Sequence, residues 1–200
     1  MDGHTFKYDG VGNPTDYYNG RAYDMTWKEG RRLSSVKVAE QTTAYAYDYE
    51  GTRTEKRVGE NCMTRYIIIA GKSVGEIRYD SNGNETDYIR YIFDENGSVT
   101  GLSVWSDTAS SWVNYYFMKN LQGDVLKVYH GGNNSLVAEY SYDSWGNILT
   151  ATGSMAQLNP FRYRGYYYDA ETGFYYLENR YYASEAGWFL NDDVIKKNCS

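Results

Sequence analysis

A short turn motif recurs along this chain and constrains the fold more than any other feature. Four stretches begin with Tyr-Asp and place a glycine three residues after the aspartate, and a fifth has Phe in place of Tyr. The aspartates and glycines of these copies are Asp9 and Gly12, Asp48 and Gly51, Asp80 and Gly83, Asp94 and Gly97, and Asp143 and Gly146. Met118–Gly123 is a weaker copy with Asn at the Asp position, and Tyr168–Gly173 has one extra residue. Such self-similarity indicates a repeated supersecondary unit.

Each copy predicts a β-hairpin turn. The Asp of a type I turn accepts hydrogen bonds from backbone N–H groups two residues on, and Gly three residues later can take the positive φ that closes the turn with a small bulge. The aspartates are therefore interpreted as structural. Calcium would need several oxygens converging on one loop, and each turn offers one or two carboxylates. Another large residue usually stands two positions before the turn aromatic: Phe6, Tyr45, Ile77, Tyr91, Tyr116, Tyr140 and Tyr166.

That alternation has period two and is typical of a strand with one aromatic face. The 24 tyrosines and 20 glycines, against two prolines, favour strands and turns over helices. The copies are irregularly spaced, which argues against a propeller or an ankyrin-like array. Sheets twist and bare edges invite pairing, so a strip of hairpins must curl. We predict an all-β fold, a curved or spiralling strip of antiparallel hairpins over residues 1–158, with a compact segment over residues 159–200.

Charge and polarity exclude several functions. The chain has 20 basic and 26 acidic residues, a formal net charge of −6, which argues against a general nucleic-acid binder. Its longest apolar run, Ile67–Ala70, is far too short to span a membrane. The polar start shows no signal peptide. If the protein is exported, the signal lies upstream in a longer chain or export does not use one, and we expect this chain to be a fragment.

Cysteine and histidine residues predict neither a cofactor nor a metal. Cys62 and Cys199 are far apart and do not indicate a disulfide framework. Neither of them pairs with His4 or His130 at zinc-like spacing.

A second motif occupies the last fifth of the chain. Asn159–Leu177 reads NPFRYRGYYYDAETGFYYL, and Glu178–Asp193 continues with ENRYY and then GWFLNDD. With the repeated turns, this segment resembles the YD repeats and the repeat-associated core of the RHS family, over nearly the whole chain. The positions that carry the core resemblance are Pro160, Arg164, Gly165, Asp169, Gly173, Arg180, Tyr181, Gly187, Phe189 and Asp193.

The resemblance implies a shell. RHS and related shells are long β-strips that spiral into a hollow cage whose end the core caps or plugs. In polymorphic toxins a variable toxin domain follows the core and is held inside, and in many members the core is an aspartyl autoprotease that frees the toxin. Other relatives are wall-associated or adhesive surface proteins.

The core departs from the family pattern where the protease acts. Ala183 stands at the first of the family's two Asp-Pro positions, and Asp193 stands at the second without its proline. Trp188 replaces the usual Arg. An aspartyl mechanism needs two close carboxylates, and the neighbouring Asp192 would point to the opposite strand face. We therefore predict no self-cleavage and a vestigial Asp193, with Glu185 as a substitute carboxylate being the alternative.

One further contact site is suggested by tryptophans. Trp105 and Trp112 flank the polar stretch Ser106–Ser111, which predicts a long hairpin with an exposed tip. Their rings could stack on a sugar or simply pack the sheet. One short helix is predicted near Gly153–Leu158, ended by Pro160.

Three hypotheses follow from the sequence. The first is a structural, encapsulating segment of a polymorphic-toxin or cell-surface shell, secreted or surface-exposed within a longer chain and partnered by the rest of that shell or a downstream toxin domain. The second is a module that binds glycans or another protein. The third is an active autoprotease. A piece of this size should expose strand edges or a concave aromatic surface, so we also predict self-association.

Overall fold

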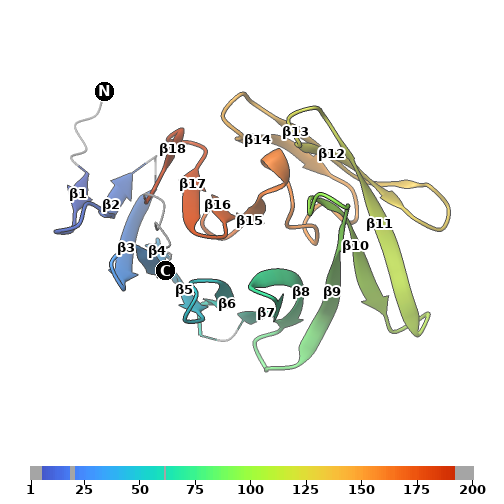
Figure 1. Cartoon of the computed structure of the whole chain (residues 1–200), viewed down its shortest axis with the longest axis horizontal. Coiled ribbons are helices and arrows are strands. Elements are labelled where there is room, and N and C mark those ends of the chain that lie inside the picture. Colours follow the sequence, from blue (N-terminus) through green and yellow to red (C-terminus); the bar gives the residue numbers. More distant parts are fainter. Residues whose placement is uncertain (1–5, 19–20, 61, 192–200) are drawn as a thin grey trace, which may run out of the picture.

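The structure, a computed structural model, describes residues 6–18, 21–60 and 62–191, and nearly all its regular elements are antiparallel strands (Figure 1). Fourteen strands form one sheet in which each strand pairs with its neighbours in sequence. The strands are β1 (Lys7–Tyr8), β2 (Pro14–Tyr18), β3 (Ala22–Lys28), β4 (Arg32–Val38), β5 (Gln41–Tyr47), β6 (Arg53–Val58), β7 (Cys62–Ile69), β8 (Lys72–Tyr79), β9 (Glu85–Phe93), β10 (Val99–Ser106), β11 (Ser111–Lys119), β12 (Val125–His130), β13 (Leu136–Tyr142) and β14 (Ile148–Thr152). The predicted all-β strip of hairpins is confirmed.

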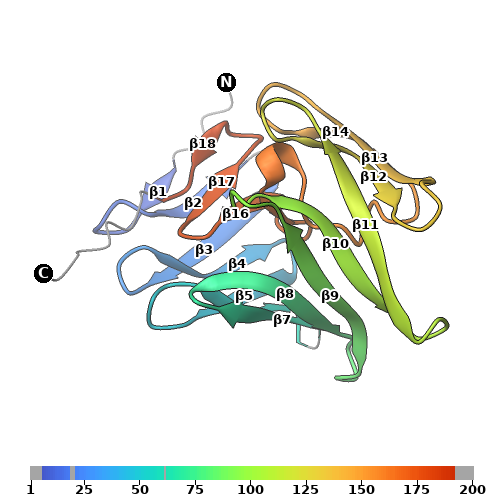
Figure 2. The same ribbon diagram turned by 45° about the vertical axis from the view of Figure 1, so that its right-hand side comes forward.

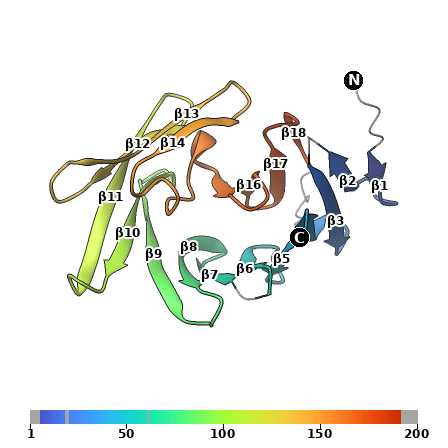
Figure 3. The ribbon, with the colours of Figure 1, turned by 180° about the vertical axis from the view of Figure 1, so that it is seen from behind.

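The remaining elements form a compact C-terminal unit, called here the core segment (Asn159–Asn191). A four-stranded antiparallel sheet comprises β15 (Tyr167–Asp169), β16 (Phe174–Leu177), β17 (Arg180–Ala183) and β18 (Trp188–Phe189). It is preceded by one turn of 3-10 helix, η1 (Tyr163–Gly165). The strip curves around this segment, so that β15–β18 lie inside the arc, as both opposed views show (Figures 1 and 3).

Alternation along the strands explains why one face of the strip packs inward. In β3, Tyr23 and Met25 are buried while Asp24 between them is exposed. The strand register shifts at the aromatic before several turns, as at Tyr47 and Tyr142. These irregularities are β-bulges, which bend a strand and increase its twist, and the oblique view shows the resulting curvature (Figure 2).

The hydrophobic core lies between the strip and the core segment. On the β7–β14 side, Leu102, Val125 and Val128 pack with Phe161 and Tyr167 of the core segment. On the β2–β6 side the core segment packs against Leu33, Val36, Tyr17, Tyr23 and Tyr45 through Phe174, Tyr181, Ala183 and Leu190. The predicted open concave aromatic surface is therefore wrong in this part, because the core segment covers it.

The predicted helix near Gly153–Leu158 is also wrong. These residues form turns in which the Met155 N–H donates to the Val137 carbonyl of β13. The Ala156 carbonyl, which a helix would use, instead accepts hydrogen bonds from Tyr140 Oη and Arg162 Nη2. Only isolated turn bonds form within the segment, from Ala156 N–H to the Gly153 carbonyl and from Asn159 N–H to the Met155 carbonyl, and they do not extend into a helix. Within the described residues, no helix is long and apolar enough to cross a membrane.

Candidate functional site: a buried charge network between the strip and the core segment

The repeated turns share one hydrogen-bonding pattern. In the turn at Asp143, Oδ1 accepts the N–H of Trp145 at 2.8 Å and of Asn147 at 2.9 Å. The same pair of bonds forms at Asp9, Asp80, Asp94 and Asn120, and the second bond forms at Asp48. The closing glycines all have φ between +80° and +92°: Gly12, Gly51, Gly83, Gly97, Gly123 and Gly146. Each carboxylate or amide thus satisfies backbone donors of its own turn.

Asp169 differs from these aspartates. The N–H groups of Thr172 and Gly173 bond to its backbone carbonyl, and its carboxylate turns away from the loop. That carboxylate is fully buried and accepts hydrogen bonds from Arg53 Nη1 at 2.6 Å and Lys56 Nζ at 2.9 Å. Both cations belong to β6, so this one side chain joins the core segment to the strip.

Arg53 is enclosed by aromatic rings. Its guanidinium lies 4.1 Å from the ring centroid of Tyr176 and 4.8 Å from that of Tyr66, and its Nη2 donates to Tyr66 Oη at 2.8 Å. Tyr45 and Tyr167 add contacts at 5.3 and 5.0 Å. A guanidinium stacks on aromatic faces and tolerates burial better than an ammonium, so this position suits Arg and not Lys.

A second buried carboxylate lies nearby on β8. Glu76 Oε2 accepts hydrogen bonds from Tyr91 Oη at 2.6 Å and from Tyr167 Oη of the core segment at 2.8 Å. Its other oxygen accepts a bond from Arg78 Nε at 2.7 Å, and Arg78 Nη2 also donates to the Leu158 carbonyl. Tyr167 therefore contacts charged groups on two strands of the strip, Arg53 of β6 and Glu76 of β8.

Electrostatics keep both carboxylates ionised. Burial alone would raise the pKa of Asp169, but the charges of Arg53 and Lys56 outweigh it and lower that pKa below the usual value. Burial would also raise the pKa of Glu76. The charge of Arg78 and the hydrogen bonds from Tyr91 and Tyr167 outweigh burial and lower that pKa below its usual value. Burial raises the pKa of Tyr66 and Tyr167, so both stay neutral donors. The arrangement fastens two parts of the fold together, with each carboxylate paired to cations.

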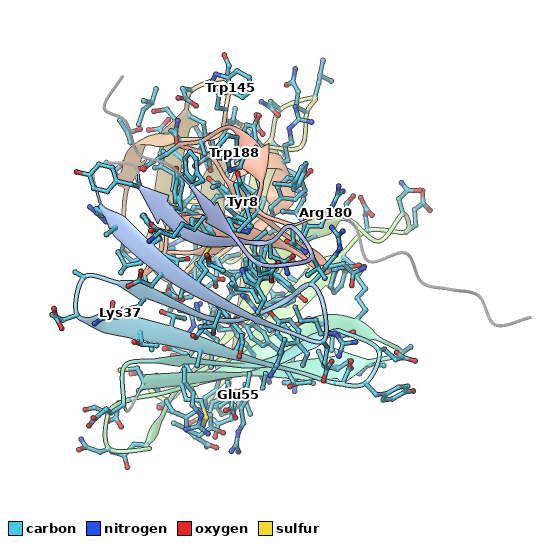
Figure 4. The ribbon with its side chains drawn as sticks, turned by 90° about the vertical axis from the view of Figure 1, so that its left-hand side faces the viewer. Tyr8, Lys37, Glu55, Trp145, Arg180 and Trp188 are labelled. Atoms are coloured by element: carbon cyan, nitrogen blue, oxygen red, sulfur yellow. The ribbon has the colours of Figure 1, made fainter. Side chains whose placement is uncertain are left out.

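The core segment is also hydrogen-bonded to one turn of the strip. Three tyrosine hydroxyls of the core segment donate hydrogen bonds to three successive carbonyls of the β13–β14 turn. The bonds run from Tyr163 to Ser144 at 3.0 Å, from Tyr182 to Trp145 at 2.8 Å and from Tyr175 to Gly146 at 2.8 Å. Gly146 is needed here for space as well as for φ, because a Cβ would lie 2.5 Å from the Tyr163 ring. Figure 4 shows Trp145 and Trp188 together at this end of the molecule.

The other positions of the core motif shape the segment itself. Arg164, Gly165, Gly173 and Gly187 all take positive φ. The Pro160 carbonyl accepts the Tyr168 N–H, Arg180 stacks on Phe189 at 4.2 Å, and the hydroxyls of Tyr181 and Tyr47 share a hydrogen bond of 2.8 Å.

The protease positions fall partly within the structure. Ala183 is buried in β17, opposite Phe174 and Trp188. Asp192 and Asp193 lie outside the described residues, as does Cys199. Cys62 is free and exposed. In the described part of the chain, no three His, Cys, Asp or Glu side chains gather as a potential metal site.

Trp105 and Trp112 face each other across the β10–β11 hairpin, as its predicted tip requires. Their rings are edge to face with centroids 5.6 Å apart, and both are half-buried. Arg90 lies 3.8 Å over the Trp112 ring, and Trp105 Nε1 donates to Asp107.

Sequence reasoning missed the charge network itself. It placed Asp169 in a turn motif and gave no role to Arg53, Lys56 or Glu76. The one available signal was the extra residue in Tyr168–Gly173, which breaks the spacing that lets an aspartate reach its own turn amides.

A strip of Tyr-Asp hairpins wrapped around its own C-terminal segment is the architecture of a shell protein. The model of the family described as Teneurin YD-shell matches residues 3–198. The chain belongs to that family and is a structural segment of the shell type.

Curated relatives include far longer proteins. The chain is 31% identical over 193 residues to the tRNA nuclease WapA of Bacillus subtilis (strain 168), which covers 94% of the chain and 8% of WapA. It is 25% identical over 185 residues to salivary gland surface protein 1 of Aedes aegypti, covering 85% of the chain and 5% of that protein. The chain thus spans less than a tenth of the length of these relatives.

Solved structures share the fold. The crystal structure of TcdB2-TccC3 superimposes with a TM-score of 0.75 at 18% identity, covering 94% of the chain and 10% of that protein. TcdB2-TccC3 without its hypervariable C-terminal region superimposes with a TM-score of 0.72 at 19% identity.

Proposed function

We propose that this chain is the closing segment of a hollow shell in a longer secreted or cell-surface protein, and that its core segment seals one end of that shell around a cargo domain. The observation that carries the proposal is the burial of the core segment inside the arc of the strip, fastened by Asp169 on β15. A segment held by buried ion pairs and by apolar clusters on both sides is suited to be a fixed wall of a container. The toxin-related names of several relatives support a cargo of that class.

The proposal requires a longer natural protein and a protected cargo. An antibody against this segment should detect, in culture fluid or on cells of the natural host, a protein much larger than 23.0 kDa. Limited proteolysis of that protein should leave the part that follows the core segment intact for longer than the same part expressed alone. A natural protein of only 23.0 kDa, or equal digestion of the attached and free cargo, would refute the encapsulating role.

We further propose that this shell does not cut itself. Ala183, at the first of the two positions where the family has an aspartate, removes one carboxylate of the pair that aspartyl chemistry needs. A chain extended past Ser200 should therefore keep its full mass after purification. A cut that disappears on Asp193→Asn would contradict this, and a cut that disappears on Glu185→Gln would identify the alternative carboxylate.

A binding role at the β10–β11 hairpin is the second candidate, favoured by the two half-exposed rings of Trp105 and Trp112. A glycan array would test it, with Trp105→Ala as the matched variant. Spots that bind the wild type and are lost in the variant would support an adhesive function, whereas a flat array would remove glycans from consideration.

A further inference from the structure

A cavity of about 360 Å³ lies at the rim of the strip, where the β7–β8 and β9–β10 turns and the end of β11 meet the core segment. Its volume is in the lower range of pockets that hold small molecules. The cavity is lined in part by tyrosines of the charge network, including Tyr91 and Tyr176. Its other lining residues come from the β7–β8 and β9–β10 turns, from β11 and from the core segment.

Three cationic side chains line this cavity without a carboxylate partner. Lys72 Nζ donates to the Gly97 carbonyl at 2.7 Å and lies 4.0 Å from the Phe93 ring centroid. Within residues 6–18, 21–60 and 62–191, no carboxylate oxygen lies within 4.0 Å of Lys72, Lys119 or Arg164. Among the described lining residues, Glu178 is the sole carboxylate. The cavity therefore carries an excess of positive charge.

Lys119 is the cation among these three whose pKa burial lowers. It is half-buried, and burial lowers its pKa while the charge of Asp94 opposes the shift. A half-buried ammonium that lacks a bonded anion has lost part of its favourable hydration, and no ion pair compensates for that loss. An incoming anion would restore that interaction.

The walls of the cavity are apolar and aromatic. Phe93, Phe161 and Tyr166 line it together with Val99 and Leu177. Aromatic walls with a few converging polar groups are typical of sites for organic ligands, in which rings take up the body and charges fix the orientation. An inorganic ion would use the cations but has no apolar body to contact the exposed edges of these rings.

We propose that this cavity binds a small organic anion, with a phosphate or carboxylate group held by Lys72, Lys119 and Arg164 and an aromatic body against Phe93 and Phe161. The site does not rest on the proposed shell function, since it is complete within the described chain. Phenyl phosphate combines both halves of such a ligand in one molecule.

The test is calorimetric titration of the purified chain with phenyl phosphate at low ionic strength. We expect a dissociation constant of about 0.1–1 mM, with inorganic phosphate and phenol each binding at least about tenfold more weakly. The Lys119→Gln and Arg164→Gln variants should each weaken phenyl phosphate binding by about tenfold. Arg164 is exposed, and its guanidinium lies 5.4 Å from the ring centroid of the buried Tyr163, so a thermal unfolding curve must first show that Arg164→Gln is folded. Lys37 is on β4 and is not among the residues that line the cavity. Lys37→Gln is therefore the matched control and should bind as the wild type does.

Several results would overturn the proposal. Absence of heat at about 10 mM phenyl phosphate with a folded protein would exclude the site. Equal binding of phenol would show that the cations are not used, and equal binding of inorganic phosphate would show an ion site without an aromatic body. If neither Arg164→Gln nor Lys119→Gln changes the affinity for phenyl phosphate, the ligand binds elsewhere.

Discussion

Replacement of Asp169 by Asn should test the charge network most directly. The exchange keeps the size of the side chain and its β15 backbone, but it removes the negative charge that Arg53 and Lys56 share. Lys56 retains a second anion, because its Nζ lies 2.9 Å from Glu171 Oε1. Arg53 retains only tyrosine hydroxyls and ring faces, with side-chain exposure of 1%. The loss of stability should therefore come mainly from the buried Arg53 guanidinium, which is left without a counter-ion.

The magnitude follows from that stranded charge. Removing one partner of a buried ion pair costs about 3–5 kcal/mol, because the remaining ion pays desolvation without compensation. A domain has about 5–15 kcal/mol of total stability. Asp169→Asn should thus lower the unfolding free energy by a large fraction. A second exchange, Arg53→Met, should restore part of the loss in the double variant, since it removes the stranded ion.

Urea unfolding followed by tyrosine fluorescence would measure the effect. The midpoint should fall strongly in Asp169→Asn, with a similar slope if the unfolded chain is unchanged. Glu40→Gln, which alters the exposed Lys37–Glu40 pair, is the control and should change little. A loss below about 1 kcal/mol in Asp169→Asn, the range of exposed pairs, would show that the network does not fasten the core segment.

Other consequences can be tested in the same chain. The pKa values of Asp169 and Glu76 are lower in the folded than in the unfolded chain, so their stabilisation is present above about pH 4 and is lost as the pH falls through the folded-state values; acid unfolding should be steep in the wild type and shallower in Asp169→Asn. Gly12 and Gly146 have φ of +89° and +92°, but a Cβ meets nothing at the first and a tyrosine ring at the second. Gly146→Ala should therefore cost about 1–3 kcal/mol more than Gly12→Ala, and equal losses in thermal unfolding would refute that contact. Strand β14 pairs only with β13 among the described residues and exposes Leu149; light scattering should show concentration-dependent association that Leu149→Lys weakens, and a monomeric wild type at all concentrations would contradict it.

The strip was predictable because its determinants are local. An Asp and a Gly three residues later suffice to make a hairpin turn, and the alternating rings on either side tell which face packs inward. The order of the fourteen strands then follows, since each hairpin pairs a strand with its neighbour. The core segment was recognisable only by resemblance, because its short strands and its 3-10 turn have no strong pattern of their own.

The network was not predictable because its partners are distant in sequence. Arg53 and Asp169 are separated by 116 residues, and β6 reads RTEKRV, a polar sequence typical of a solvated strand. Its buried members, Arg53 and Lys56, are three residues apart and break the period of two. The sequence of β6 alone therefore does not predict that these cations are buried. Their counter-ion, Asp169, belongs to the core segment and contacts them only in the folded chain.

This dependence explains why one motif can have two roles. A sheet whose strands pair only with their sequence neighbours behaves as a quasi-one-dimensional array, and each hairpin is stabilised by the next. The β2–β6 and β7–β14 parts of the array meet directly at the β6–β7 ladder. The core segment adds a second connection, because Asp169 bonds to β6 and Tyr167 bonds to Glu76 of β8. An aspartate whose carboxylate bonds to its own turn closes one hairpin. An aspartate whose turn is one residue longer has its carboxylate available for a distant cation, and through it the C-terminal segment is bonded to β6 of the strip.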